Sequence, residues 1–148
     1  MTKVLFVCTG NTCRSPLAES LLKNMNLPGV EVKSAGTFAT NGSEASINTK
    51  MVLEEKGIPH HHTSSMLTEE LVQWADHILT MTVGHKTTVI DLFPKTEVKV
   101  LTLKEFAGID GEHDIADPYG RPVEVYRDTY EEIKEAIDTI VEKLKESS

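Results

Sequence analysis

Continuous apolar runs alternate along the chain with segments in which apolar residues recur every three or four positions. Runs that are apolar throughout are typical of buried strands in a parallel sheet, whereas the recurring pattern is typical of helices. We therefore expect four strands, at about residues 3–8, 30–34, 77–81 and 98–103. We expect helices at about residues 15–26, 43–56, 68–75, 84–92 and 122–146, with loops at 58–67 and 104–121.

This alternation predicts an α/β fold, a doubly wound four-stranded parallel sheet flanked by helices. No internal repeat, low-complexity segment or linker interrupts the 148 residues. A chain of this length is expected to bury a core of its own and to form one domain. The sequence therefore predicts a single domain that spans residues 1–148.

Local signals predict where several helices begin and end. Ser15 precedes Pro16, so we expect Ser15 to cap a helix that has proline in its first turn. Gly57 suits the left-handed position just after a helix, and Thr68 is expected to cap the next one. The last helix carries one apolar stripe, formed by Tyr126, Tyr130, Ile133, Ile137, Ile140 and Leu144.

Composition and charge narrow the classes of function. The net charge is −8, which disfavours broad contact with nucleic acid or anionic lipid. No stretch approaches the roughly 20 apolar residues needed to cross a bilayer, and the start of the chain lacks the pattern of a signal peptide. We therefore expect a cytoplasmic protein without a nucleic-acid or membrane partner, and the sequence leaves the oligomeric state open.

In doubly wound sheets, ligands bind beyond the carboxyl ends of the strands. That rule points to four segments that follow the expected strands, at residues 8–15, 34–37, 82–85 and 104–121. The first of them reads CTGNTCRS and holds the chain's two cysteines, Cys8 and Cys13. In a reducing compartment such cysteines are more often reactive than structural, so this segment carries the main chemical hypothesis.

Five residues separate Cys8 from Arg14, which is enough for a loop whose backbone N–H groups converge on an anion. Gly10 permits a positive φ at low cost, and Asn11 tolerates a left-handed conformation better than most residues. The start of the following helix adds positive potential, and the guanidinium of Arg14 fits two phosphate oxygens. The segment therefore predicts a phosphate-binding loop.

The same positive groups are expected to lower the pKa of Cys8 and to make its thiolate a nucleophile. Ser15 is positioned to donate a hydrogen bond to the sulfur, which would help the thiolate leave a thiophosphate intermediate. The alternative interpretation is that Cys8 is a small buried residue at a strand end and that Arg14 is a surface residue. That alternative leaves the strand–loop–helix context and the spacing unexplained.

The stretch VCTGNTCRSPLAE at residues 7–19 resembles the signature of the low-molecular-weight protein tyrosine phosphatase family. The likeness continues with SAGT at 34–37, GI at 57–58, MT at 81–82 and DPYG at 117–120. The resemblance implies this fold and a cysteinyl-phosphate mechanism without a metal or cofactor. It also implies phosphorylated protein substrates, Cys8 and Arg14 as catalytic residues, and a substrate site formed by Thr9, Gly10, Asn11, Thr12, Cys13, Ser15 and Tyr119.

Phosphate transfer also needs a proton donor for the departing atom. The loop at 104–121 offers five carboxyl groups, and the sequence alone does not rank them: Glu105, Asp110, Glu112, Asp114 and Asp117. The resemblance selects Asp117, which precedes Pro118; the alternative is that this Asp-Pro pair only forms a turn. The resemblance further implies that Ser34 and Asn11 support the loop through a mutual hydrogen bond and that His85 is a less certain support.

Two positions bear on the substrate. At position 12, tyrosine-directed members of the family usually carry a bulky aliphatic residue. The threonine found here resembles the protein arginine phosphatase branch of the family. A hydroxyl can meet guanidinium N–H groups that an aliphatic side chain would leave unpaired. Tyr119 is followed by Gly120, so the aromatic pair usual in tyrosine-directed members is reduced to one ring. We therefore expect phosphoarginine in proteins as substrate, with phosphotyrosine as the alternative.

Other classes of function remain as alternatives. An arsenate reductase that relays a disulfide needs further cysteines, and none follows Cys13. A redox sensor would join Cys8 and Cys13 in a disulfide, which we expect only as secondary regulation. A phosphate-binding module would not depend on the Cys8 sulfur. The triplet His60-His61-His62 has no acid or cysteine at ligand spacing, so no metal site is expected.

Overall fold

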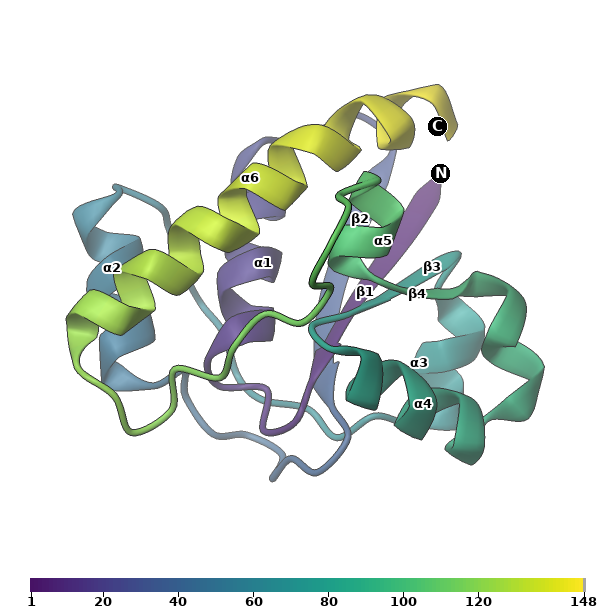
Figure 1. Ribbon diagram of the computed structural model, residues 1–148, viewed down its shortest axis with the longest axis horizontal. Helices are drawn as coiled ribbons and strands as arrows, with labels where there is room; N and C mark the ends of the chain where they lie inside the picture. The colour runs from purple at the N-terminus through teal and green to yellow at the C-terminus, as the bar shows by residue number, and fades with distance from the viewer. Residues whose placement is uncertain (148) are drawn as a thin grey trace.

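The computed structural model describes residues 1–147, which form a parallel sheet covered by helices (Figure 1). The strands are β1 (Thr2–Cys8), β2 (Val30–Gly36), β3 (His77–Thr80) and β4 (Val100–Thr102). The helices are α1 (Arg14–Asn24), α2 (Ile47–Glu55), α3 (Glu69–Trp74), α4 (Val83–Leu92), α5 (Leu103–Ala107) and α6 (Val123–Ser147), with a 3-10 helix, η1, at Pro94–Lys99.

The four strands lie in the order β2-β1-β3-β4, and every neighbouring pair is parallel. This arrangement confirms the predicted fold class. β1 is central, and its side chains alternate between the two faces: Val4 and Phe6 belong to one buried cluster, Leu5 and Val7 to the other. All four are fully buried, which explains why the run is apolar throughout.

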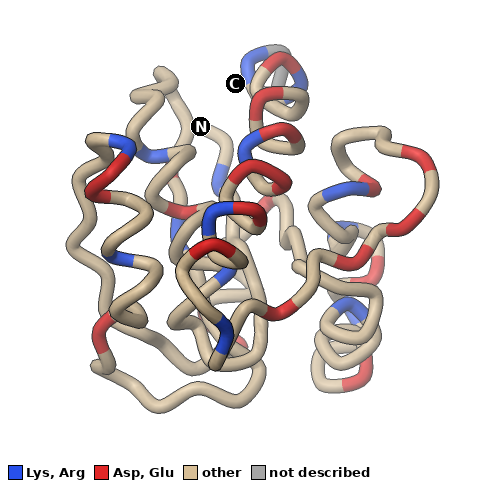
Figure 2. The backbone as a smooth tube through the Cα atoms, turned by 60° about the vertical axis from the view of Figure 1, so that its left-hand side comes forward, with Lys and Arg blue, Asp and Glu red and all other residues tan. Residues whose placement is uncertain are grey.

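Helices cover both faces of the sheet. The larger cluster packs α1, α2 and α5 with α6, whose apolar stripe is buried as the spacing predicted. The smaller cluster packs α3 and α4 on the other face. The outer side of α6 carries alternating acidic and basic residues (Figure 2). None of the helices among residues 1–147 is long and apolar enough to cross a membrane.

Several element ends differ from the prediction. α1 begins at Arg14 with Cys13 as the preceding residue, so Ser15 lies inside the helix and does not cap it. α2 begins at Ile47, because Glu44 forms a β-bridge with Thr63 and Ser46 caps the helix by accepting from the Thr49 N–H. The predictions of a cap at Thr68 and of a left-handed Gly57 are confirmed.

The loop expected at 104–121 begins as a short helix. Thr102 and Glu105 form a capping box for α5, in which each side chain accepts from the other residue's N–H, and Gly108 ends the helix in a left-handed conformation. The fourth strand is shorter than predicted because η1, which starts at Pro94, occupies residues up to Lys99. Neither difference moves the carboxyl ends of the strands, where the loops at the lower edge of Figure 1 gather.

Candidate active site

A pocket of about 210 Å³ lies at the carboxyl edge of the sheet, at the turn from β1 into α1. The loop of residues 8–15, called the phosphate loop below, forms its floor, and the segment before α6 closes one side. Its lining residues are Cys8, Thr9, Gly10, Thr12, Cys13, Arg14, Asp117 and Tyr119. The structure therefore brings the expected nucleophile, cation and acid into one pocket.

Asn11 does not line the pocket; it holds the phosphate loop from behind. It is fully buried with φ 56°, the left-handed conformation that the sequence predicted. The Ser65 N–H donates to its Oδ1 at 2.8 Å, which fixes the amide so that Nδ2 donates to the oxygens of Ser15 and Ser34. Gly10, which would permit a positive φ, does not take one. Asn11 alone makes the left-handed turn of this loop.

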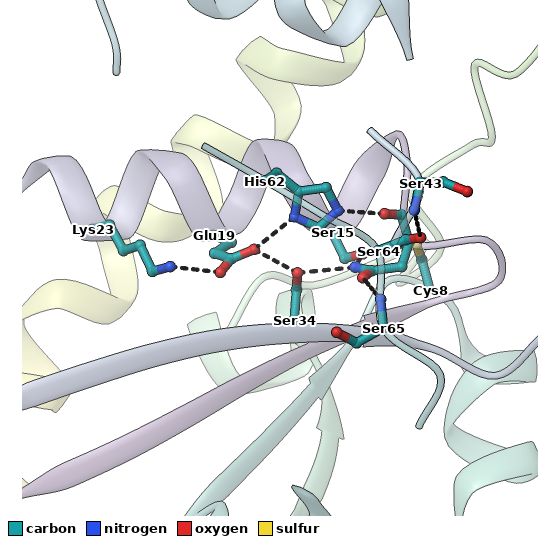
Figure 3. Close-up of polar contacts among 10 residues, drawn as sticks. Cys8, Ser15, Glu19, Lys23, Ser34, Ser43, His62, Ser64 and Ser65 are labelled. Atoms are coloured by element: carbon teal, nitrogen blue, oxygen red, sulfur yellow. Dashed lines mark hydrogen bonds and ion pairs between the residues drawn. The ribbon is translucent and has the colours of Figure 1, made fainter. Parts of the chain in front are cut away.

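Hydrogen bonds connect Asn11 to Glu19 through Ser34 and through His62, and Figure 3 shows both of these side chains directed at the Glu19 carboxylate. Ser34 donates to Glu19 Oε1 at 2.6 Å while accepting from Asn11, so the contact implied by the resemblance is present. Lys23 pairs with the other carboxylate oxygen at 2.7 Å. Burial by itself raises the pKa of Glu19, but the hydrogen bonds from His62, Lys23 and Ser34 outweigh it and lower the pKa to about 2. Glu19 is therefore a buried anion that orients the network.

His62 joins this network to the loop backbone. Its Nδ1 lies 3.1 Å from Glu19 Oε1 and its Nε2 lies 2.6 Å from the carbonyl oxygen of Asn11. The sequence pattern of the histidine triplet suggests no such role for His62. The other two histidines have different surroundings: His60 Nε2 lies 3.4 Å from Glu54 Oε1, and His61 is exposed. Within residues 1–147, no group of three or more His, Cys, Asp or Glu side chains is arranged to hold a metal ion.

The sulfur of Cys8 lies 2.9 Å from the hydroxyl oxygen of Ser15. Because Asn11 already donates to that oxygen, the Ser15 proton is available to the sulfur. Burial raises the pKa of the Cys8 thiol above its ordinary value, while Ser15, Arg14 and the Asn11 amide act to lower it. The predicted lowering of this pKa is therefore wrong, because burial raises the pKa by more than the neighbouring groups lower it.

Arg14 is buried and points toward the acid side of the pocket. Its Nη1 donates to the Ile115 carbonyl at 2.7 Å, and its Nη2 lies 3.7 Å from Asp117 Oδ2. Its Nε is one of two buried side-chain nitrogen or oxygen atoms that lack a hydrogen-bond partner within residues 1–147. The guanidinium is thus held by the backbone and keeps a donor for an anion.

Asp117 is the only one of the five candidate carboxyl groups that lines the described pocket. Its side chain is about half exposed, and its Oδ1 accepts from the Tyr119 N–H at 3.0 Å. Glu105 belongs to the α5 capping box, and Asp114 accepts from the Val83 N–H. Tyr119 is 74% exposed at the pocket edge, so its ring is free to contact a substrate.

Thr9 and His85 meet on another side of the phosphate loop. The Thr9 hydroxyl lies 2.7 Å from His85 Nε2. Burial and the nearby Arg14 lower the pKa of His85 to about 4, against the opposing effect of Asp117 and Asp114. His85 is therefore neutral at physiological pH and supports the loop through Thr9.

Cys13 is buried, and its sulfur contacts three hydroxyl groups, those of Tyr126 at 3.5 Å, Ser46 at 3.7 Å and Thr12 at 3.8 Å. Burial, with the neighbouring Cys13, raises the pKa of Tyr126 to about 12. Both cysteines are free thiols. A regulatory disulfide between Cys8 and Cys13 stays a prediction.

Gly36, at the end of β2, lets the next loop approach the phosphate loop. A Cβ at this position would lie 2.2 Å from the Thr9 carbonyl oxygen and 3.1 Å from the Asn11 nitrogen. The close approach allows two backbone hydrogen bonds, in which the Thr37 and Phe38 N–H groups donate to Cys8 and Thr9. The surrounding sequence, SAGT, indicates the family likeness but not this close approach.

The model for the low molecular weight phosphotyrosine protein phosphatase family matches residues 3–148 of this chain. The chain belongs to this family. A protein-arginine-phosphatase of Geobacillus stearothermophilus is 57% identical over 144 residues, which cover 97% of this chain and 96% of the relative. The solved YwlE arginine phosphatase from Geobacillus stearothermophilus is 55% identical, with a TM-score of 0.95 over 99% of this chain and 95% of that one.

Relatives named as tyrosine phosphatases also match. The low molecular weight protein-tyrosine-phosphatase PtpB of Staphylococcus aureus is 42% identical over 131 residues, or 88% of this chain and 91% of the relative. The family resemblance noted in the sequence is thereby confirmed, together with its arginine phosphatase branch. Phosphorylated proteins are the substrates that membership of this phosphatase family implies.

Proposed function

We propose that this chain is a protein arginine phosphatase, which removes phosphate from phosphoarginine residues through a cysteinyl-phosphate intermediate. The observation that carries the chemistry is the pocket in which Cys8, Arg14 and Asp117 meet. The phosphoryl group would lie on the phosphate loop, with its oxygens facing the loop N–H groups and Arg14 Nε. No metal or cofactor takes part in the proposed reaction.

In the first step, the Cys8 thiol loses its proton to solvent and the thiolate attacks phosphorus. A sulfur–phosphorus bond forms as the phosphorus–nitrogen bond breaks. Protonated Asp117 gives its proton to the departing guanidine nitrogen, which leaves as the free arginine side chain. Arg14 and the loop amides stabilise the charge on the equatorial oxygens during this transfer.

In the second step, water attacks the phosphorus of the cysteinyl phosphate. Asp117, now a carboxylate, takes a proton from that water, and the sulfur–phosphorus bond breaks. Inorganic phosphate and the Cys8 thiolate result. The Ser15 hydroxyl, 2.9 Å from the sulfur, stabilises the leaving thiolate.

Thr12 supports the assignment of arginine. It lines the pocket, and its hydroxyl makes only a long contact of 3.8 Å with the Cys13 sulfur among the described residues. That hydroxyl is therefore available to accept from a guanidinium N–H, which an aliphatic side chain would leave unpaired. The relatives named as protein-arginine-phosphatases, at up to 57% identity, point the same way.

The test compares wild type with Thr12→Ile on two peptides of the same sequence, one with phosphoarginine and one with phosphotyrosine. We expect wild type to have the higher kcat/KM on phosphoarginine and Thr12→Ile to shift the preference toward phosphotyrosine. The kcat/KM of Thr12→Ile on phosphoarginine is expected to fall by about 10- to 100-fold, the effect of leaving one buried guanidinium N–H without a partner. Equal or better phosphotyrosine turnover by wild type contradicts the arginine assignment and leaves the thiol chemistry intact.

We also propose that the enzyme works in a reducing compartment, the cytoplasm. The reaction needs Cys8 as a free thiol, and both cysteines are free in the structure. A disulfide between them would remove the nucleophile. Fractionation of the source cells with an antibody against the chain would test this location.

A further inference from the structure

Two exposed apolar side chains stand beside the pocket without being part of its lining. Phe38 is 85% exposed and Ile47 is 76% exposed, which places both among the most exposed large apolar residues of the described chain. Single exposed apolar residues are common, but these two begin and end the stretch of residues 38–47, whose backbone is hydrogen-bonded to the pocket lining at both ends. We call Phe38 and Ile47 the apolar rim.

Both rim residues are tied to the phosphate loop through the backbone. The Phe38 N–H donates to the Thr9 carbonyl at 3.0 Å, and the Ser46 N–H, next to Ile47, donates to the Thr12 carbonyl at 2.9 Å. Thr9 and Thr12 line the pocket. The backbone that carries the two apolar side chains is therefore held beside the pocket at both positions.

The start of α2, which carries Ile47, also contacts the segment that precedes α6. Asn48, the next residue, donates from its side chain to the Arg121 carbonyl, two residues beyond Tyr119. This bond joins the start of α2 to the segment that carries Asp117 and Tyr119. The start of α2, with Ile47, therefore lies next to the segment that places Tyr119 at the pocket edge.

The segment that carries the rim is almost uncharged, although the chain as a whole has a net charge of −8. Between residues 37 and 49 the only charged side chain is Glu44, which pairs with Lys50 at 3.2 Å. The lower edge of the molecule in Figure 2, where the loops after β1 and β2 run, is accordingly mostly uncharged. A partner on this surface would be held by apolar contact and not by charge.

The pocket, at about 210 Å³, has room for one phosphorylated side chain. The polypeptide on either side of that residue must therefore lie outside, over the pocket edge. We propose that the apolar rim binds this polypeptide, so that the enzyme favours protein substrates with apolar side chains next to the phosphorylated residue. This inference rests on the proposed function and adds a sequence preference to it.

The test uses two phosphoarginine peptides of equal length and charge, one with Leu and one with Ser on both sides of the phosphorylated residue, and free phosphoarginine as a small reference. We expect wild type to favour the Leu peptide in kcat/KM by about tenfold, the effect of covering one apolar side chain. Phe38→Ala and Ile47→Ala should each reduce that preference, and the double variant should abolish it. Val98→Ala, at a position that is 96% exposed and outside the pocket lining, should keep it.

The contribution of the apolar rim to binding can be measured without turnover in the Cys8→Ser variant, by fluorescence anisotropy of a labelled peptide. Rim-dependent binding with no phosphate release by wild type would contradict the proposed function and support the rim. Phosphate release with no Leu preference, or with a preference that the double variant retains, overturns the rim and leaves the function standing. A dimer that the double variant dissociates, with peptide rates unchanged, would show that the rim binds a second copy and would also overturn the inference.

Discussion

The Nε2 of His62 lies 2.6 Å from the carbonyl oxygen of Asn11, while its Nδ1 faces Glu19 at 3.1 Å. A carbonyl oxygen and an ionised carboxylate both accept hydrogen bonds, so each ring nitrogen of His62 faces an acceptor. The ring thus bridges the backbone of the phosphate loop and the Glu19 carboxylate. Through this ring, α1 and the loop before α3 hold the backbone of the phosphate loop in its left-handed turn.

Glu19→Gln should change how the stability depends on pH. The pKa of Glu19 falls from an ordinary 4.5 to about 2 in the fold, which corresponds to about 3 kcal/mol of folding free energy. Because the folded-state pKa is the lower one, this stability is present above pH 4.5 and is lost as the pH falls toward 2. Urea unfolding at several pH values should show a smaller acid loss in Glu19→Gln than in wild type.

Glu31→Gln is the matched control, because Glu31 is an exposed residue on β2 outside the network. Its free energy of unfolding should follow the wild-type dependence on pH. If Glu19→Gln loses stability between pH 5 and pH 2 as steeply as wild type does, then Glu19 does not carry the buried charge and this reading of the network is wrong.

Ser15→Ala should raise the pKa of Cys8 further. Burial is the main cause that raises this pKa, and the Ser15 hydrogen bond is the strongest of the effects that oppose it. A higher pKa means less thiolate at a given pH, so the curve of iodoacetamide alkylation rate against pH should move to higher pH in Ser15→Ala. Ser20→Ala, a buried serine on the same helix outside the pocket lining, should leave the curve in place. A curve that moves to lower pH in Ser15→Ala contradicts the proposed contact.

The phosphate loop was predictable because its signals are local. Cys8 and Arg14 lie within one turn between a strand and a helix, and the carboxyl-end rule located that turn in the sheet. The capping box of Thr102 and Glu105 is equally local, although the prediction of a loop at 104–121 does not include it. Short sequence patterns therefore predict individual turns and helix ends, because the interactions that form them involve residues close together in the chain.

His62 and Glu19 were missed because their contacts are distant in the sequence. His62 lies 51 positions from Asn11 and 43 from Glu19, and nothing near His62 distinguishes it from His60 and His61. The raised pKa of Cys8 was missed for a related reason: the sequence shows the positive neighbours of the sulfur, but not how completely the packed helices exclude water from it. Both features depend on tertiary packing.

Gly36→Ala should disturb the phosphate loop directly. The added Cβ would meet the backbone oxygen of Thr9 at 2.2 Å, and a backbone group cannot rotate aside as a side chain can. We expect a loss of about 1–3 kcal/mol in the free energy of unfolding, as for other overpacked sites. A fall of kcat/KM on any phosphorylated substrate should accompany it, because Thr9 and Asn11 would shift.

Gly57→Ala separates the effect on the site from a general loss of stability. Gly57 has a φ of 68° and open space around its Cα, so alanine there is strained but meets no atom. We expect it to lower the free energy of unfolding by about 1 kcal/mol and to leave kcat/KM at the wild-type value. Equal activity of Gly36→Ala and Gly57→Ala would show that the loop tolerates the added carbon.

Asp117→Asn should slow the reaction most for substrates whose leaving group must be protonated. An amide cannot give a proton to the departing nitrogen, so we expect kcat on a phosphoarginine peptide to fall by about 10²- to 10⁴-fold. A substrate such as para-nitrophenyl phosphate, whose leaving group needs little protonation, should lose far less. Asp110→Asn, in the same segment but outside the pocket lining, should behave as wild type on both substrates. An equal loss on both substrates would mean that Asp117 acts by holding Arg14, 3.7 Å away, and not by transferring the proton.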